Sequence, residues 1–267
     1  MKPKIAFIVL TFNEEKNLRA CLESIKPIAS EIFVVDSGST DKTVDIARSY
    51  GAEVIVHEFK NQAEQFNFAL DNSDIKSDWI FRIDADEYLL PELREEILEV
   101  LPKVSEEVSG FYLRRRLYFM GRWIKHGGYY PTWILRLWRK GKGRVEERAM
   151  DEHTILLHGR AENLKNDFVD DNKNGLSSWI QKHNNYAGRE AEEAVKGRYG
   201  RGRKREIYYK FPPFLRAFVY FKYRYFFQLG FLDGLAGLIY HVLHGFWYRF
   251  LVDAKIYEKH KETKRGA

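Results

Sequence analysis

The alternation of apolar, β-branched runs with stretches of helical period constrains the fold of residues 1–90 more than any other feature of the chain. The apolar runs occupy 4–12, 31–36, 53–59 and 79–84, and the helix-period stretches between them occupy 14–26, 41–50 and 61–72. The runs lack polar alternation, which is typical of parallel strands covered on both faces. Alternating strands and helices form right-handed βαβ units. The sequence therefore predicts an α/β fold with an open, mostly parallel sheet and flanking helices.

The rest of the chain predicts a second part with a different character. A helix follows Pro91, and strand-like pieces and a further helix follow it at 110–119, 133–139 and 175–197. Residues 197–205 are basic and punctuated by glycine, which is typical of a linker. Residues 207–250 hold 17 of the chain's 41 aromatic residues, interleaved with Lys and Arg. We therefore predict a catalytic domain over 1–196 and, over 197–267, a basic loop with an amphipathic, aromatic-rich helical tail.

Cysteine usage and net charge limit the classes of function. A lone Cys21 excludes an internal disulfide and a cysteine-built zinc site, and its place in an apolar-periodic helix predicts a buried thiol in a reducing compartment. The chain opens on Met-Lys-Pro-Lys and runs directly into a strand-like segment, so we expect no secretory signal and a cytoplasmic protein. A net charge of +6 is weak support for a phosphate-backbone partner, and we expect no nucleic acid.

Polar residues follow the predicted strands where ligands bind in open α/β sheets, at the carboxyl ends. The sharpest group is Asp84-Ala85-Asp86 after the run 79–84. Two carboxylates one residue apart bring hard oxygen ligands to Mg²⁺ or Mn²⁺, and a diphosphate completes the shell. The alternative is an acidic turn that caps the helix beginning near Pro91, because turns favour Asp.

The ends of the first two strands have two interpretations each. Asp36 precedes Ser-Gly-Ser-Thr-Asp, so its carboxylate could accept from a base imide N–H, or Ser39 or Asp41 could simply cap the next helix. Thr11 and Asn13 could bind a nucleotide or cap the helix that follows. The side chain at position 12 could pack against a base or enter the core.

Together these residues resemble glycosyltransferase family 2, which has the GT-A fold. The lines that carry the resemblance are IVLTFNEEKNL, IFVVDSGSTDKTVDIARSYGAEV, NQAEQFNFAL and DWIFRIDADEYLLPEL. The resemblance is specific over 1–93 and looser to about 190. It looks nearest to bacterial members of the lipopolysaccharide-core and capsular glucosyltransferase type. The resemblance implies inverting transfer of a sugar from a nucleotide sugar.

The resemblance also implies roles for individual residues. Thr11, Glu14 and Asp36 hold the nucleoside and Asn13 belongs to the same nucleotide-binding set, while Asp84 meets the ribose and the metal side and Asp86 is the metal ligand. Gln65 and Asn67 fall where relatives carry a Gln and an Asn. They line the donor side, or else they form a polar helix face.

The general base is expected among four carboxylates, Glu146, Glu147, Asp151 and Glu152. Inversion needs a carboxylate that takes the proton of the attacking hydroxyl. Relatives of this type carry Val-His-Glu and, further on, Leu-His-Tyr. Aligned on the helix 176–187, Met150-Asp151-Glu152 matches the first element and Val169-Asp170-Asp171 the second. This favours Glu152, then Asp151; the alternative is that these acids belong to a solvated surface loop. Asp replaces both histidines, so Asp170 takes the place of a His in metal binding.

The amino-acid sequence allows three functions. A glycosyltransferase, with UDP as the expected nucleotide and a lipid-linked saccharide as the expected acceptor, accounts for the carboxylates. A sugar-phosphate nucleotidyltransferase needs a glycine-rich basic loop after the first strand, where this chain has Thr11-Phe12-Asn13-Glu14. A non-enzymatic membrane or nucleic-acid module leaves the carboxylates unexplained.

The tail is expected to bind the membrane surface, peripheral on the inner face of the cell membrane, without crossing it. Its longest stretch free of Asp, Glu, Lys and Arg runs from Gly234 to Tyr248, fifteen residues, short of the ~20 that a spanning helix needs. Basic and aromatic residues alternate around it, which suits a helix at headgroup level. The alternative is that these helices pack on the catalytic domain or form a homodimer.

Overall fold

The computed structural model describes residues 2–146, 153–197 and 203–265, and the chain divides into two compact units. The first compact unit comprises the described residues of Met1–Tyr118, Pro131–Arg148 and Glu152–Lys173, and the second comprises those of Phe119–Tyr130 and Asn174–Ala267. The predicted boundary at 196/197 stays a prediction. Helix α5 (Gly175–Val195) packs along α9 (Tyr248–Arg265) within the second unit.

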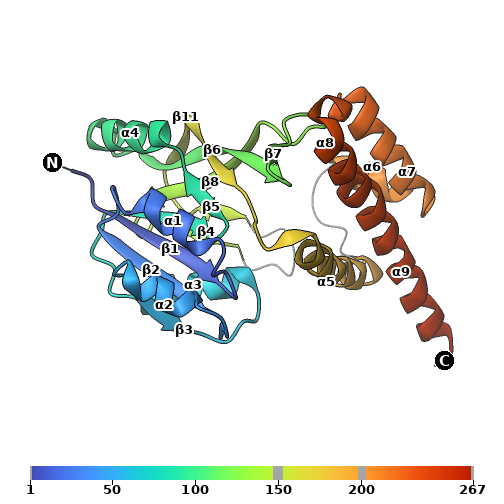
Figure 1. Ribbon diagram of the computed structural model, residues 1–267, viewed down its shortest axis with the longest axis horizontal. Coiled ribbons are helices and arrows are strands. Elements are labelled where there is room, and N and C mark those ends of the chain that lie inside the picture. The colour runs from blue at the N-terminus through green and yellow to red at the C-terminus, as the bar shows by residue number, and fades with distance from the viewer. Residues whose placement is uncertain (1, 147–152, 198–202, 266–267) are drawn as a thin grey trace. The chain divides into compact units, whose positions relative to one another are not determined.

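The first unit is built on one mixed sheet (Figure 1). Its strands are β1 (Ile5–Thr11), β2 (Glu31–Asp36), β3 (Glu53–Val56), β4 (Trp79–Asp84), β5 (Glu87–Leu89), β6 (Val108–Phe119), β8 (Thr132–Arg139) and β11 (Arg160–Asp170). They lie in the order β3-β2-β1-β4-β8-β6-β11-β5. The pairs among β3, β2, β1 and β4 are parallel, as is β6 with β11, whereas β8 is antiparallel to β4 and β6, and β5 to β11. A separate pair, β9 (Gly143–Val145) and β10 (Thr154–Leu156), is antiparallel.

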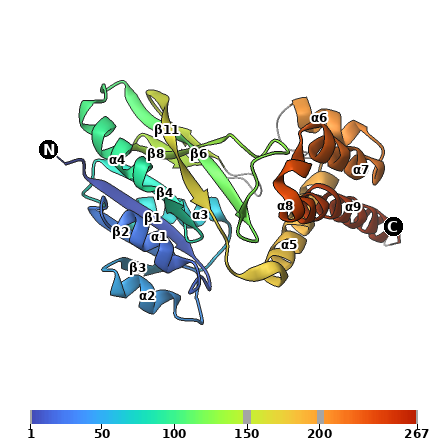
Figure 2. The same ribbon diagram turned by 45° about the horizontal axis from the view of Figure 1, so that its top comes forward.

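Helices cover both faces of this sheet, and strands such as β1 are apolar on both sides. The helices are α1 (Leu18–Ile25), α2 (Thr43–Ser49), α3 (Gln62–Asn72) and α4 (Pro91–Val100), which a 3₁₀ turn, η1 (Leu101–Lys103), follows. Ile5, Phe7 and Val9 of β1 pack with α1, α2 and α4, whereas Ala6 and Ile8 pack with α3. The turned view shows β3, β2, β1 and β4 side by side (Figure 2). The predicted fold class, an open, mostly parallel sheet with flanking helices and a helical C-terminal extension, is confirmed.

The second unit is helical apart from the short strand β7 (Arg122–Trp123). Its remaining elements are α6 (Arg203–Lys210), α7 (Leu215–Lys222), the π-helical turn η2 (Tyr223–Phe227), the 3₁₀ turn η3 (Gly230–Asp233), α8 (Gly234–Tyr240) and the π-helical turn η4 (His241–Trp247). Buried charges tie its helices together. Asp253 of α9 accepts from Arg216 Nε at 2.9 Å, and the carboxylate of Glu190 in α5 accepts from the Tyr248 hydroxyl at 2.7 Å and pairs with Arg249 at 3.1 Å.

The buried His241 and the half-buried His183 make the second unit sensitive to acid. His183 stacks on Trp179, with ring centroids 3.5 Å apart, and its Nδ1 donates to the Trp179 carbonyl at 2.8 Å. Burial lowers the pKa of His183 to about 4, and burial likewise lowers the pKa of His241 to about 4. The unfolded chain binds these protons near pH 6.5, so between pH 6.5 and 4 it takes up protons that the folded chain does not.

We therefore expect the melting temperature of this unit to fall as the pH falls from 6.5 towards 4. The melting curve should be followed by far-ultraviolet circular dichroism at several pH values. His183→Phe keeps a flat ring against Trp179 and should flatten the decline. An equally steep decline in that variant would contradict the assignment to His183.

Candidate active site

The ends of β1 and β2 bring Thr11 and Asp36 together as predicted. The two residues are opposite one another in the parallel ladder, and Thr11 Oγ1 donates to Asp36 Oδ1 at 3.0 Å. Asp36 is buried, and the turn that follows it supplies further donors. Gly38 N and Ser39 N donate to Oδ2 at 3.0 and 2.8 Å, and Ser39 Oγ donates to Oδ1 at 2.5 Å. Gly38 has φ +86°, a conformation that favours glycine.

Asn13 and Glu14 fasten the loop after β1 to the loop after β2. Asn13 has φ +54°, its N–H donates to Ser39 Oγ at 2.8 Å, and its Oδ1 accepts from Thr40 N at 2.8 Å. Glu14 N donates to Thr43 Oγ1 at 2.8 Å. Between Thr11 and Asn13, the side chain of Phe12 is 57% exposed, so it is available to a ligand and is not part of the core.

Gln65 and Asn67 are buried on α3, and both amides are engaged within the protein. Gln65 Oε1 contacts His57 Nδ1 at 2.8 Å, and its Nε2 donates to Ser37 Oγ at 3.0 Å. Asn67 pairs with the main chain of β9, because its Nδ2 donates to the Val145 carbonyl at 2.8 Å and its Oδ1 accepts from Val145 N at 3.1 Å. Asn67 therefore fixes β9 against α3, and contact of either residue with a donor stays a prediction.

The acidic turn Asp84-Ala85-Asp86 lies at the same edge of the sheet, because Asp84 is opposite Leu10 in the β4–β1 ladder. Strand β11 passes directly beside the turn. Asp170 is opposite Glu87, Asp171 N donates to the Asp86 carbonyl at 2.9 Å, and Asn172 Nδ2 donates to Asp86 Oδ2 at 2.8 Å. The three predicted metal-binding residues, Asp84, Asp86 and Asp170, are thus neighbours.

An ion pair that sequence reasoning missed supports this turn. Arg136 of β8 is buried and pairs with Glu87 Oε1 and, at 3.2 Å, with Asp84 Oδ2. Glu87 Oε2 accepts from Asp84 N at 2.9 Å. Burial raises the pKa of Glu87, Arg136 opposes that rise, and Asp84 and Asp170 add to it. Burial by itself lowers the pKa of Arg136, but Glu87 and Asp84 reverse this and raise it.

We expect Arg136→Met to destabilise the first unit by about 3–5 kcal/mol, because removal of one partner leaves a buried carboxylate uncompensated. Urea unfolding followed by circular dichroism measures the loss. Arg144→Met is the matched control, since Arg144 forms an exposed pair with Asp71 and should cost at most about 1 kcal/mol. Adding Glu87→Leu to Arg136→Met should recover much of the loss. Equal losses in the two single variants would contradict the buried-pair account.

Arginines of β6 hold the neighbouring acids in place. Arg114 Nε and Arg116 Nε pair with the buried Asp167 at 2.8 and 2.6 Å, and Arg115, on the other face of the strand, pairs with Asp170 at 3.2 Å. The three arginines therefore alternate between the two faces of the strand. On the neighbouring strand β8, Trp133 is partly exposed with Arg114 over its ring, and Trp138 is buried against Phe66.

The carboxylates expected to include the general base lie between β9 and β10. Glu146 N donates to the His153 carbonyl at 2.9 Å, which closes the β9–β10 ladder at this end. Glu147, Asp151 and Glu152 lie outside the described residues. The choice of Glu152, and then Asp151, as the base therefore stays a prediction.

The donor set of the acidic turn fits a divalent cation only together with a diphosphate. Carboxylate oxygens suit Mg²⁺ or Mn²⁺, and Asn172 orients the carboxylate of Asp86. Within 2–146, 153–197 and 203–265, no three His, Cys, Asp or Glu side chains form a group that could hold a metal ion. Mg²⁺ commonly binds one or two protein carboxylates plus substrate phosphates, so Asp84 and Asp86 suffice when a diphosphate supplies the rest.

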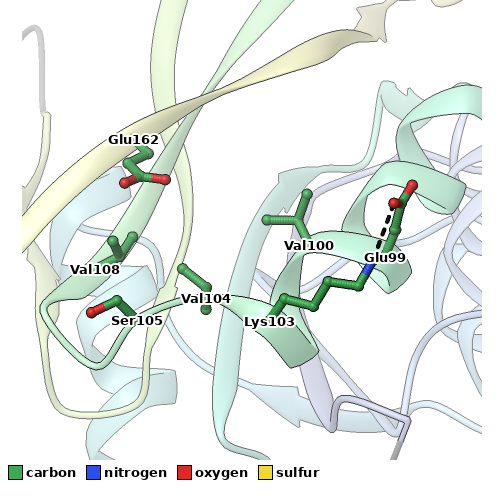
Figure 3. Close-up of a pocket in the computed structure, with 7 residues that line it drawn as sticks. All are labelled: Glu99, Val100, Lys103, Val104, Ser105, Val108 and Glu162. Atoms are coloured by element: carbon green, nitrogen blue, oxygen red, sulfur yellow. Dashed lines mark hydrogen bonds and ion pairs between the residues drawn. The ribbon is translucent and has the colours of Figure 1, made fainter.

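A surface hollow of about 290 Å³ lies away from these residues, where α4 leads into β6 (Figure 3). Its lining consists of Glu99, Val100, Lys103, Val104, Ser105, Val108 and Glu162. Lys103 pairs with Glu99 across one turn of helix at 3.2 Å. None of the predicted site residues lines this hollow.

The chain is similar to known glycosyltransferases. Residues 6–160 match the family model "Glycosyl transferase family 2". A lipopolysaccharide core biosynthesis glycosyltransferase, LpsC of Rhizobium meliloti (strain 1021), is 34% identical over 97% of this chain and 93% of that protein. An uncharacterized glycosyltransferase, RT0209 of Rickettsia typhi, is 44% identical, but over only 35% of this chain and 32% of its own length.

Among solved structures, glucosyl-3-phosphoglycerate synthase from Mycobacterium tuberculosis, in complex with Mn²⁺, uridine diphosphate and glucosyl-3-phosphoglycerate, aligns with 43% of this chain and 44% of its own. Its sequence identity is 22% and its TM-score 0.36. Because the family model covers more than half of the chain and LpsC aligns over nearly all of it, the chain belongs to glycosyl transferase family 2.

Proposed function

We propose that this family 2 member is an inverting, metal-dependent hexosyltransferase that moves a sugar from a UDP-sugar to a saccharide acceptor. One observation carries the proposal. The Thr11–Asp36 pair and the acidic turn Asp84–Asp86, with Asp170 beside it, converge on one edge of the sheet. This is the edge at which open α/β sheets bind ligands.

Asp36 is suited to accept from the N–H of a uracil base. Its Oδ2 is held by two backbone N–H groups, whereas its Oδ1 accepts from the hydroxyls of Thr11 and Ser39. A hydroxyl can rotate and donate elsewhere, so Oδ1 can exchange one of these bonds for a base N–H. The exposed ring of Phe12 offers an apolar surface beside it.

Transfer in this proposal is a single displacement. The acceptor hydroxyl attacks the anomeric carbon, its proton passes to the carboxylate of Glu152, and the bond from the anomeric carbon to the diphosphate oxygen breaks. Asp86 and Asp84 would hold a Mg²⁺ or Mn²⁺ ion, which would supply charge stabilisation for the leaving diphosphate. Arg136 and Arg115 offset the repulsion among Glu87, Asp84 and Asp170, which keeps the acidic turn formed before a ligand binds.

The acceptor that fits best is a lipid-linked saccharide of the lipopolysaccharide type, presented at the inner face of the cell membrane. LpsC is named for lipopolysaccharide core biosynthesis. Residues 197–267 carry fifteen Lys and Arg against five Asp and Glu. A surplus of cations attracts anionic headgroups and saccharide phosphates.

A donor screen tests the proposal. The purified chain is incubated with UDP-glucose, UDP-galactose, GDP-mannose or a dTDP-sugar, with MnCl₂ and extracted lipopolysaccharide core, and released nucleotide is measured. We expect UDP release from a UDP-hexose that depends on both metal and acceptor. Pyrophosphate release from UTP and a sugar 1-phosphate, with no release from any sugar nucleotide, would instead identify a nucleotidyltransferase.

A further inference from the structure

The second unit contains a helix pair with a sharp break. Leu215–Phe227 and Gly230–Glu262 are bent by 71° relative to one another, and by length and composition the two together could cross a membrane. No single helix in the described parts of the chain is long and apolar enough to do so. Leu229, at the break, has φ +60°, which is strained for a leucine.

Both arms of this break expose an apolar stripe at helical spacing. On the first arm the stripe consists of Leu215, Val219, Tyr223 and Phe227, and on the second of Phe231, Leu235, Leu238 and Val242. The most exposed members stand on either side of the break, Phe227 at 79% and Leu235 at 72%. The opposite sides are packed within the unit, because Arg216 and Ala217 on the first arm and Tyr240 and His241 on the second are buried. A contiguous exposed apolar surface of this kind marks an interaction site.

No exposed charge interrupts the region around the break. Asp233 is the one Asp, Glu, Lys or Arg from Tyr225 to Tyr248, and it is 2% exposed. Its carboxylate accepts from His126 N at 2.9 Å and pairs with His126 Nδ1 at 2.6 Å. Because this charge is paired within the protein, the exposed side chains from Tyr225 to Val242 are apolar or aromatic, and the amide of Gln228 is half-buried.

The irregular backbone at the break has partners inside the protein. Gly127 N donates to the Gln228 carbonyl at 2.8 Å, and Gln228 N donates to the Tyr223 carbonyl at 3.0 Å. Gly127 and Gly230 both pack on the His241 ring, so closely that a Cβ at either position would clash with it. Broken helices are tolerated at membrane depth only where protein satisfies the freed backbone groups, and this condition is met here.

Cations and aromatic rings border the break. Arg122 lies beside Gly234, since a Cβ added there would meet Arg122 Cζ at 3.9 Å. Lys125 Nζ lies over the Trp123 ring, 5.3 Å from its centroid, and Trp123 meets Tyr130 edge to face. Trp, Tyr and long cationic side chains are the residues that anchor proteins at the headgroup level.

We propose that the segment from Phe214 to Val242 is a bent membrane wedge, whose tip from Phe226 to Leu235 enters the hydrocarbon of one leaflet of an anionic bilayer. Arg122 and Lys125 meet the phosphates of the headgroups. A bilayer fits this surface better than a second copy of the chain, because two stripes on arms bent by 71° converge on a tip with internally paired backbone and a cationic border. Insertion buries the apolar side chains of the tip, and the cationic border adds attraction to the anionic headgroups. Membrane insertion by this wedge does not depend on the proposed function. Its connection with a lipid-linked acceptor does rest on the proposed function.

A single-site fluorescent label tests the insertion. Cys21 is the chain's one cysteine and is buried, so a new exposed cysteine in the full chain can be labelled selectively. Phe227→Cys carrying an environment-sensitive dye should show a blue shift and a severalfold rise in emission with vesicles of phosphatidylglycerol and phosphatidylcholine. Nitroxides on the lipid acyl chains should quench it. The same dye on Lys261→Cys, an exposed position of α9, should change little.

Two double variants show whether vesicle binding depends on the tip or on any exposed apolar side chain. Phe227→Ser with Leu235→Ser should weaken vesicle binding by about tenfold or more, with an unchanged melting temperature because both side chains are exposed. Val56→Ser with Leu157→Ser removes two exposed apolar side chains of the first unit and should bind vesicles like the wild type. UDP release should be unchanged in the tip variant with a water-soluble acceptor, so a failure of insertion and a failure of glycosyl transfer are distinguishable.

Three results would overturn the wedge. Absence of vesicle binding by the wild type excludes it. Binding that high salt abolishes, with the dye at position 227 still in water, indicates adsorption by the basic residues alone. A blue shift that grows with protein concentration without lipid, together with a dimer in sedimentation velocity, assigns the surface to a second copy of the chain.

Discussion

Asp86→Ala should abolish sugar transfer, with a loss on the order of a thousandfold or more, since charge stabilisation at the leaving group supplies several kcal/mol of a transfer barrier. Asp86 has no part in the core, and its carboxylate accepts from Asn172, so the variant should fold normally. Donor affinity should fall sharply because a diphosphate is held through the metal. Nucleotide release and calorimetric titration with the donor and MnCl₂ measure the two effects.

The matched control for this change is Asp74→Ala. Asp74 is exposed and pairs with Lys76 on the surface, so its loss should leave transfer intact. Unchanged turnover in Asp86→Ala, or full activity of the wild type in excess chelator, would remove the metal-assisted mechanism while leaving family membership untouched.

Glu152→Gln should lower the rate of transfer by about a hundred- to ten-thousandfold, the usual contribution of a general base, and leave donor affinity unchanged. The amide keeps the size of the side chain and removes the group that accepts the proton. An interaction made only in the transition state is lost from kcat and not from ground-state binding. Single-turnover rates and donor titrations of the same preparation separate these quantities.

Further variants identify the general base if it is not Glu152. An inactive Asp151→Asn beside an active Glu152→Gln would shift the assignment by one residue. If both remain active, Glu146→Gln and Glu147→Gln are the next tests. Of these four carboxylates, Glu146 is the one that the structure describes, at the end of the ladder that joins β9 to β10.

The βαβ part of the fold could be predicted because its strands are long, apolar runs. The predicted strands at 31–36 and 79–84 coincide with β2 and β4. Strands β5 and β11 were missed for different physical reasons. β5 is three residues long and sits directly behind an acidic turn, and β11 carries Arg, Glu, Lys and Asp along an edge that faces ion pairs as well as core. Neither has the continuous apolar pattern that marks a covered strand.

Position in the chain and resemblance predict Asp84, Asp86 and Asp170 as metal-binding residues. The structure places them close together, and their role in metal binding stays a prediction. In the sequence, nothing but its neighbours distinguishes Arg136 from the other arginines of a basic, aromatic segment. Only the pairing of β8 with β4 shows that it is buried against Glu87. One signal was available, because Arg136 is the lone charge within the run TWILRLW.

The pairing of Asn67 with Val145 has a consequence for engineering. Both ends of the segment 147–152 start from fixed backbone, because Asn67 pairs with Val145 and Glu146 N donates to His153. A segment with anchored ends can be exchanged like a cassette. Grafting residues 147–152 from relatives onto this scaffold should therefore yield chimaeras that fold with an unchanged melting temperature.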